Sequence, residues 1–160
     1  MVAVKAQIAP LRERLEGEIR ELKASNVTLE QQHSELQQDM LQSAATLGDD
    51  CMVSRLLHQT GVSVDHVFPH FDGKTMLHAA AGKGHVDVVK VLINKGADVN
   101  QRTTTAQGHT PLMRASQQGH PTVVEMLLAH GASPNIATLD DGKTPLYYAS
   151  HAGHVTLWRC

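Results

Sequence analysis

Apolar side chains recur every seven residues along the first forty positions of the chain. The residues of this row are Ile8, Leu15, Leu22, Leu29 and Leu36. A spacing of seven places them along one side of a helix. The facing row is mixed and consists of Arg12, Ile19, Asn26, His33 and Met40. The pattern predicts a long amphipathic helix over residues 1–40, of the kind that pairs with another helix in a coiled coil.

A single Asn in such a seam is typical of a parallel two-stranded coiled coil, in which Asn26 pairs with its twin and fixes the register at a cost in stability. Glu18 could then meet Lys23 of the second strand. The seam is diluted by charged side chains, and Gly17 costs about 1 kcal/mol in a helix interior. The residues expected at the contact are Leu15, Ile19, Leu22, Asn26, Leu29 and Leu36. A homodimer, docking on another protein and packing on the following segment all stay open.

The pattern changes after residue 40, where a repeat begins. No linker rich in Gly, Pro or Ser separates the two parts, so the helix is expected to continue into the repeat. GKTMLHAAAGKGH at 73–85 returns as GHTPLMRASQQGH at 108–120 and as GKTPLYYASHAGH at 142–154. Successive copies are 35 and 34 residues apart. A fixed period of this length is the signature of stacked supersecondary units.

Each copy predicts two short helices. The first begins after a Thr that can cap its N-terminus, with Pro at the first helical position in two copies, and ends at a Gly in the left-handed conformation. These residues are Thr75, Thr110 and Thr144, then Pro111 and Pro145, then Gly84, Gly119 and Gly153. The second helix has apolar residues at helical spacing, Val88, Val89, Val91 and Leu92 in one copy and Val123, Val124, Met126 and Leu127 in the next. Helices of about ten residues are marginal alone in water, so stacking must stabilise them.

These segments resemble the ankyrin repeat, whose pattern is G-x-T-P-L-H-x-A-A-x-x-G-H…V-V-x-x-L-L-x-x-G-A-x-x-N. The match covers 73–100, 108–135 and the start of a further unit at 142–160, and a degenerate first unit without the opening G-x-T-P fits 41–71. The resemblance implies an all-α solenoid over 41–160, with units at about 41–71, 72–104, 105–138 and an incomplete 139–160. The long helix of residues 1–40 precedes it.

The resemblance also implies a protein-binding module, in which first helices and β-turn fingertips line a concave surface. The positions that match this surface are Phe71, Asp72, Lys74, Lys83, Lys95, Ala106, Gln107, His109, Gln117, Gln118, His130, Asp140, Asp141, Lys143 and His151. Their mixed character names no ligand class. The loop at 101–107 is one or two residues longer than the bare repeat, and longer loops on a binding face are favoured contact sites. We predict that shortening Thr103–Gln107 weakens partner binding but not folding.

Charge and cysteine content narrow the class further. The net charge is −2, from 14 basic and 16 acidic residues, without an excess of one sign in either part. This balance does not favour nucleic acid or an anionic membrane as a partner. No apolar run approaches 18 residues and no signal-peptide pattern opens the chain, so membrane insertion is not expected. Cys51 and Cys160 form neither a CxxC nor a disulfide framework. A cytoplasmic protein is expected, with the nucleus as the alternative.

Eleven histidines raise the question of metal or acid–base chemistry. Three occupy the recurring Gly-His position, His85, His120 and His154, and His78 follows Leu in a first helix. Hydrogen bonds to the backbone between repeats account for all four. His66 and His70 are spaced as zinc ligands would be on a helix, but Pro69 disfavours a helix there. GKT at 73–75 and 142–144 lacks the earlier glycine of a phosphate-binding loop. We therefore expect no catalytic residue, no metal and no cofactor.

The sequence is interpreted as a non-catalytic adaptor or scaffold that holds a partner protein. A structural subunit, docked in a large assembly mainly through the N-terminal helix, is the alternative. Leu157 and Trp158 begin an apolar stripe that the chain does not complete, so we expect either a fragment of a longer repeat protein or a partner that covers this end. Asn100 and Asn135 match positions that ankyrin proteins can present to an asparaginyl hydroxylase, although hydrogen bonding within turns explains them too.

Overall fold

The computed structural model describes residues 2–154, with side chains from Leu11 onward. Within this range the regular elements are helices, together with one isolated antiparallel bridge between Phe68 and Lys74. The chain forms two compact units, one ending at Gln37 and the other beginning at Gln38. The all-α class predicted from the sequence is confirmed.

The first unit consists of most of helix α1, which runs from Val2 to Leu47 without a break. The predicted long helix and its continuation into the repeats are therefore confirmed. The six residues predicted at a helix–helix contact are all exposed, with Leu22 67% and Leu29 60% accessible. The side chain of Ile8 lies outside the described side chains. Both the pairing and the predicted division at residue 40 stay predictions.

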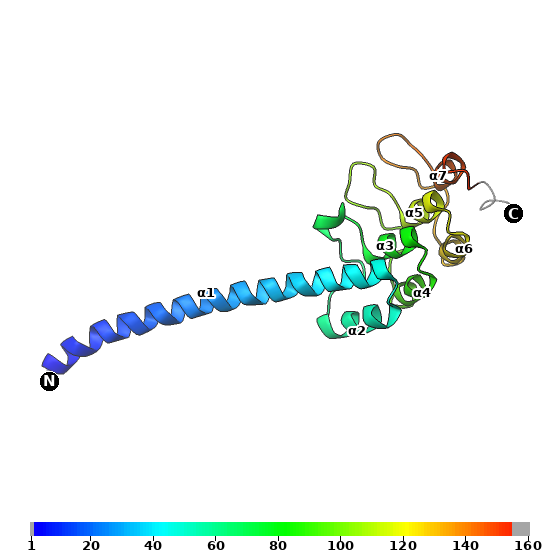
Figure 1. The fold of residues 1–160 in the computed structure, drawn as a ribbon. Coiled ribbons are helices and arrows are strands. Elements are labelled where there is room, and N and C mark those ends of the chain that lie inside the picture. Colours follow the sequence, from blue (N-terminus) through cyan, green and yellow to red (C-terminus); the bar gives the residue numbers. More distant parts are fainter. Residues whose placement is uncertain (1, 155–160) are drawn as a thin grey trace. The chain divides into compact units, whose positions relative to one another are not determined.

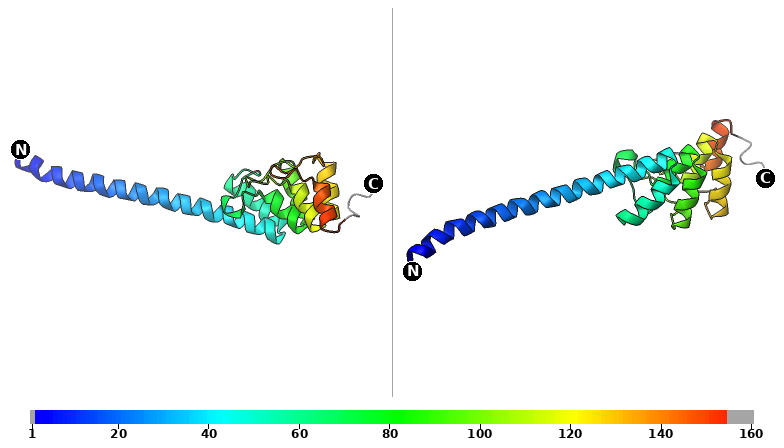
Figure 2. Two further views of the ribbon diagram at one scale, coloured as in Figure 1. Left: turned by 90° about the horizontal axis from the view of Figure 1, so that it is seen from above. Right: turned by 60° about the horizontal axis from the view of Figure 1, so that its bottom comes forward.

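The second unit is a stack of helix pairs (Figures 1 and 2). The last turns of α1 pair with α2 (Asp50–Thr60), and the next pairs are α3 (Met76–Lys83) with α4 (Val86–Asn94) and α5 (Pro111–Gln118) with α6 (Pro121–Ala129). Helix α7 (Pro145–His151) opens a fourth unit, and a short 3-10 helix η1 (Pro69–Phe71) precedes α3. The first helices α3, α5 and α7 contact one another in sequence, as do the second helices α2, α4 and α6.

Local chemistry places the helix boundaries where the sequence predicted them. Thr75, Thr110 and Thr144 are the N-cap residues, and Pro111 and Pro145 follow as first helical residues. Gly84 and Gly119 close α3 and α5 with φ of +77° and +76°, a conformation that costs glycine little. In the last unit α7 ends one residue earlier than predicted, with Ala152 as its C-cap in front of Gly153.

The core is one continuous cluster along the stack. The second helices contribute buried apolar side chains, Val88, Val89, Leu92, Val123, Val124 and Leu127. Ala80, Ala115 and Ala149 are fully buried on the first helices, where small side chains allow neighbouring helices to approach closely. Helices of eight or nine residues are marginal by themselves. Burial against neighbours therefore stabilises each pair. Leu157, Trp158 and Cys160 lie outside the described residues.

Candidate protein-binding face

We call the surface formed by the last turns of α1, by α3, α5 and α7, and by the turns that precede these helices the first-helix face. A pocket of about 520 Å³ opens on it and spans three successive units. It is lined by Gln42, Thr46, Phe71, Lys74, His78, Ala79, Gly82, Lys83, Arg114, Gln118 and His120. Four of the residues predicted for partner binding meet here, Phe71, Lys74, Lys83 and Gln118.

Arg114 is a cation of this pocket that was not predicted from the sequence. Counting from the closing glycines Gly84 and Gly119, Arg114 occupies the place in α5 that Ala79 fills in α3. The small residues Ala79 and Gly82 leave room beside it, and a β-carbon on Gly82 would lie 3.7 Å from that of Arg114. The signal was present in the repeat alignment, as a long cationic side chain at a position where the two preceding units have Ser43 and Ala79.

The pocket lining is positively charged. Lys74, Lys83 and Arg114 are its cations, and no Asp or Glu is among the lining residues. The ammonium of Lys74 lies 2.8 Å from the carboxylate of nearby Asp72, which lowers the pKa of Asp72. Burial lowers the pKa of the Arg114 guanidinium, although Asp72 acts in the opposite direction. Arginine stays charged in proteins, so Arg114 brings a partly desolvated positive charge to the pocket.

His78 forms part of the pocket wall as a structural residue. Its Nδ1 accepts a hydrogen bond from the backbone N–H of Thr75 at 3.2 Å, so Nε2 carries the proton and donates to the carbonyl of His109 at 3.0 Å. The side chain is 1% exposed, and burial lowers its pKa to about 4. His78 is therefore neutral at physiological pH, and the predicted hydrogen bond between repeats is confirmed.

His109 is a correction to the predicted surface. It is 8% exposed, and its ring packs against Tyr148 of α7 with centroids 5.3 Å apart. Its Nε2 lies 3.1 Å from the Tyr148 hydroxyl. Burial lowers the pKa of His109. The side chain turns toward the next unit because an aromatic partner is available there, so it joins two repeats and does not stand ready for a protein partner.

The turn before α7 brings together most residues predicted for the fourth unit. Lys143 lies 2.7 Å from the carboxylate of Asp141 and 4.9 Å from the ring centroid of Tyr147. The Tyr147 ring stacks on that of His151, with centroids 5.8 Å apart. Hydrogen bonds from Lys143 and Thr138 lower the pKa of Asp141 to about 2. Asp140 is exposed beside this group.

The longer turn of the third unit has a buried base and an exposed tip. Thr103 is buried, and its hydroxyl accepts a hydrogen bond from the backbone of His109 at 2.9 Å. Thr104 donates to the carbonyl of Gly73 in the preceding turn at 3.1 Å. Ala106 and Gln107 are exposed at the tip, and Gln117 is half-buried on α5. The surface available to a partner is thus narrower than the predicted Thr103–Gln107.

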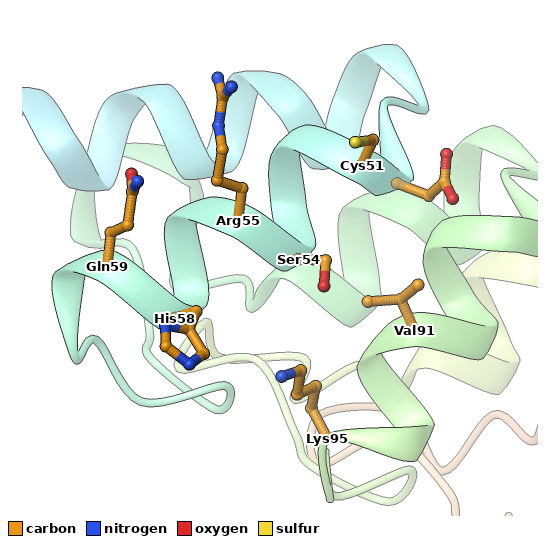
Figure 3. A pocket seen from close by; sticks show the side chains of 8 residues that line it. Cys51, Ser54, Arg55, His58, Gln59, Val91 and Lys95 are labelled. Atoms are coloured by element: carbon orange, nitrogen blue, oxygen red, sulfur yellow. The ribbon is translucent and has the colours of Figure 1, made fainter.

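Lys95 and His130 are a second correction. They are the C-cap residues of the second helices α4 and α6, so they do not belong to the first-helix face. Lys95 lines a different pocket, between α2 and α4, together with Cys51, Ser54 and Val91 (Figure 3). His130 bonds to the carbonyl of Met126 at 2.8 Å. Both residues were predicted to lie on the same surface as the first helices, and this prediction was wrong because they end second helices.

The described residues bring no metal-binding cluster together. Among the side chains of residues 11–154, no three of His, Cys, Asp and Glu lie close enough to hold a metal ion. His70 lies in the 3-10 helix η1 and His66 precedes it, with its ring against Phe68 at 4.9 Å. Pro69 was predicted to disfavour a helix that would align these two histidines, and the structure has only the short 3-10 helix η1 (Pro69–Phe71) at this point. None of the helices in this part of the chain is long and apolar enough to cross a membrane.

A stack of helix pairs joined by hairpin-like turns defines a repeat protein. The chain belongs to the ankyrin-repeat family. The family model "Ankyrin repeats (3 copies)" matches residues 19–103, 41–138 and 102–159. Ankyrin repeats generally mediate protein–protein interaction and are typically non-catalytic.

Curated relatives share the repeats but are much longer. Ankyrin repeat, SAM and basic leucine zipper domain-containing protein 1 of Echinops telfairi is 32% identical over 123 residues, which is 76% of this chain and 25% of that protein. Cortactin-binding protein 2 of the same organism is 39% identical over 60 residues, 38% of this chain and 4% of the relative. Alpha-latrocrustotoxin-Lt1a of Latrodectus tredecimguttatus is 44% identical over 59 residues, 37% of this chain and 4% of the toxin. The chain thus spans a quarter or less of the length of these relatives.

Proposed function

We propose that this protein is a non-catalytic adaptor or scaffold that holds a partner protein on the first-helix face. One observation carries the proposal. Among residues 41–154, the large apolar side chains that are exposed lie on first helices or on the turns before them: Leu47, Phe71, Leu139, Leu146 and Tyr147. The second helices α2, α4 and α6 carry none of them. Aromatic side chains surrounded by polar ones are typical of the central residues of protein interfaces.

The test compares two double variants of the full chain in a pull-down analysed by mass spectrometry. Leu139→Ser with Tyr147→Ser alters the first-helix face, whereas Lys90→Ser with Glu125→Ser alters exposed positions of α4 and α6. We expect the first variant to lose the proteins that the native chain captures and the second to retain them. If both retain the same proteins, the proposal fails.

We further propose that α1 links two copies of the chain. The exposed row of Leu15, Leu22 and Leu29 offers an apolar seam, and Glu18 can pair with Lys23 of a second strand. In the isolated helix Glu18 bonds instead to Arg14 at 3.2 Å, so the pairing requires an exchange of partners. Two linked first-helix faces would bind a repetitive partner up to 10²–10⁴-fold more tightly than one face.

The alternative is a structural subunit that docks in a large assembly through α1. The same exposed leucines support it, because a helix of this length with an uncovered apolar row can bind a different helix equally well. Leu22→Glu with Leu29→Glu in the pull-down separates the two ideas. If the captured proteins disappear with this variant and persist when the first-helix face is altered, the structural subunit replaces the adaptor.

We propose the cytoplasm as the location, with the nucleus as the alternative. Cys51 is a free, exposed thiol. Such a thiol is compatible with a reducing compartment. Fluorescence microscopy of the tagged full-length protein tests the assignment, and a secreted or luminal pattern would contradict it.

A further inference from the structure

Arg114 lacks a hydrogen-bond acceptor within the described part of the chain. Its Nε–H is shielded from solvent and makes no hydrogen bond to residues 11–154, and the guanidinium forms no ion pair there. Buried polar groups in folded proteins are nearly always partnered, because an unpaired one loses its hydration without compensation. Arg114 lines an open pocket, so the terminal nitrogens of its guanidinium, which also make no hydrogen bond within this range, can donate to an acceptor that comes from outside.

Gln42 is a second buried polar side chain at the same pocket. Its side chain is 2% exposed, and its Oε1 has no hydrogen-bond partner among the described residues. It comes from the last turns of α1, whereas Arg114 comes from α5, and both line the pocket. An amide can donate as well as accept a hydrogen bond. The unpaired oxygen of Gln42 is a hydrogen-bond acceptor, so only the NH2 group of the same amide can donate to an anion in the pocket.

The charge of the pocket selects the sign of the ligand. Asp72 pairs with Lys74 and also acts on Arg114. His78 is neutral, so the three cations outnumber this one carboxylate and the pocket keeps a net positive charge. The whole chain has a net charge of −2, so this positive pocket runs against the overall balance. A concave site lined by one sign of charge attracts groups of the opposite sign.

We propose that this pocket binds the carboxylate of an Asp or Glu side chain in an acidic segment of the partner protein, with Arg114 as its anchor. The idea rests on the proposed function, since it names the chemistry by which the first-helix face recognises its partner. A planar guanidinium and a planar carboxylate form two parallel hydrogen bonds. Ala79 and Gly82 leave space for such a group, Gln42 adds an amide, and Lys83 attracts the acidic segment from a distance.

The experiment titrates the full chain with three fluorescein-labelled twelve-residue peptides and follows fluorescence anisotropy. The peptides alternate Gly with Glu, with Gln or with phosphoserine. We expect the Glu peptide to bind at least tenfold more tightly than the Gln peptide, and Arg114→Gln to abolish this difference. Arg55→Gln, in the pocket between α2 and α4, is the matched control and should leave the difference intact. Arg114→Lys keeps the positive charge but loses the planar guanidinium that can form two parallel hydrogen bonds. It should weaken binding of the Glu peptide severalfold.

Several outcomes would overturn the proposal. Equal binding of the Glu and Gln peptides would do so, as would an undiminished preference in Arg114→Gln. Tenfold tighter binding of the phosphoserine peptide would assign the pocket to phosphate instead of carboxylate. If circular dichroism shows that Arg114→Gln does not fold, the test is the NMR resonance of the Arg114 Nε–H in the native chain. It should shift when the Glu peptide is added and stay in place with the Gln peptide, and an unchanged resonance would contradict the proposal.

The pull-down separates this idea from the adaptor function. If Arg114→Gln captures the native set of proteins while Leu139→Ser with Tyr147→Ser loses it, the first-helix face binds without the pocket. The carboxylate proposal then fails and the adaptor stands. If the peptides behave as expected but neither variant changes the captured proteins, the pocket binds carboxylates while the adaptor proposal fails.

Discussion

The imidazole of His120 lies directly against Gly84 of the preceding repeat. A β-carbon built on Gly84 would be 2.5 Å from Nδ1 of His120, closer than real side chains approach. Nε2 of the same ring lies 3.2 Å from the carbonyl of Gly82. His85 repeats the arrangement one unit earlier, against Gly48 and with its Nε2 2.7 Å from the carbonyl of Thr46. The recurring Gly-His pair thus forms a Gly–His contact between repeats, in which the Gly of one unit leaves space for the His of the next.

This Gly–His contact predicts that a side chain at Gly84 destabilises the fold. Gly84→Ala should lower the free energy of unfolding by about 2–4 kcal/mol, because a left-handed alanine costs about 1 kcal/mol and the clash with the ring adds the rest. Gly61→Ala is the matched control. Gly61 also has positive φ, at +64°, but open space around its α-carbon. It should cost only about 1 kcal/mol. Urea denaturation measures the free energy of unfolding of both variants. Equal losses would show that the His120 ring moves aside without cost.

Asn100 forms a second connection between units, through side-chain hydrogen bonds. Its side chain donates to the carbonyl of Gly131 at 3.0 Å and accepts from the N–H of Ser133 at 2.8 Å. Asn100→Ala should lower the free energy of unfolding by about 1–2 kcal/mol, since two hydrogen bonds are lost. Asn135 holds the equivalent place one repeat later, is exposed, and makes no side-chain hydrogen bond within the described residues. Asn135→Ala should be nearly neutral in thermal melts, and a similar loss at both positions would argue against the connection.

His78 predicts that the fold weakens in mild acid. Its pKa falls from 6.5 to about 4 on folding, so between these values the unfolded chain binds a proton that the folded chain does not. Stability therefore decreases as the pH falls through this window, by about 3 kcal/mol in total. The lowered pKa of His109 acts in the same direction. Asp141, with a pKa of about 2, loses its contribution only at lower pH.

The pH effect is measured by urea denaturation at pH 7 and pH 4.5. His78→Gln should reduce the difference between the two values, because Gln cannot take up the proton. Gln42 fills the corresponding place in α1, so the first repeat already accommodates this residue. His58→Gln, on the exposed side of α2, is the control and should keep the native difference. A native-like pH dependence in His78→Gln would contradict the assignment.

The proposed pairing of α1 predicts a change in oligomeric state. Leu22→Glu with Leu29→Glu should convert a dimer to a monomer in sedimentation velocity, because two charges would be placed in the apolar seam. Val27→Glu is the control, since Val27 is exposed on the same helix but lies outside the seam. It should sediment like the native chain. If the native chain is monomeric at high concentration, the homodimer proposal fails. Docking of α1 on another protein and packing on the following segment would then remain.

Much of the fold could be predicted from the sequence because its determinants are local. The threonine caps, the prolines at first helical positions and the closing glycines act within one helical turn, so their spacing identified each unit. The heptad row likewise required only the period of a helix, and α1 continues beyond that row to Leu47. The role of His85 and His120 followed too, because a histidine that recurs with the repeat meets the same neighbour in each unit.

The tertiary structure decided what each repeated position faces. His109 was predicted at the surface, but Tyr148, 39 residues later, provides an aromatic partner that buries it. Lys95 lies at the end of a second helix, next to a pocket formed with α2. Arg114 and Gln42 became important only when α1, α3 and α5 were stacked, because the pocket they line belongs to three units at once. Spacing along the chain determines which units form, whereas contacts between units determine which side chains remain unpaired and therefore available to a partner.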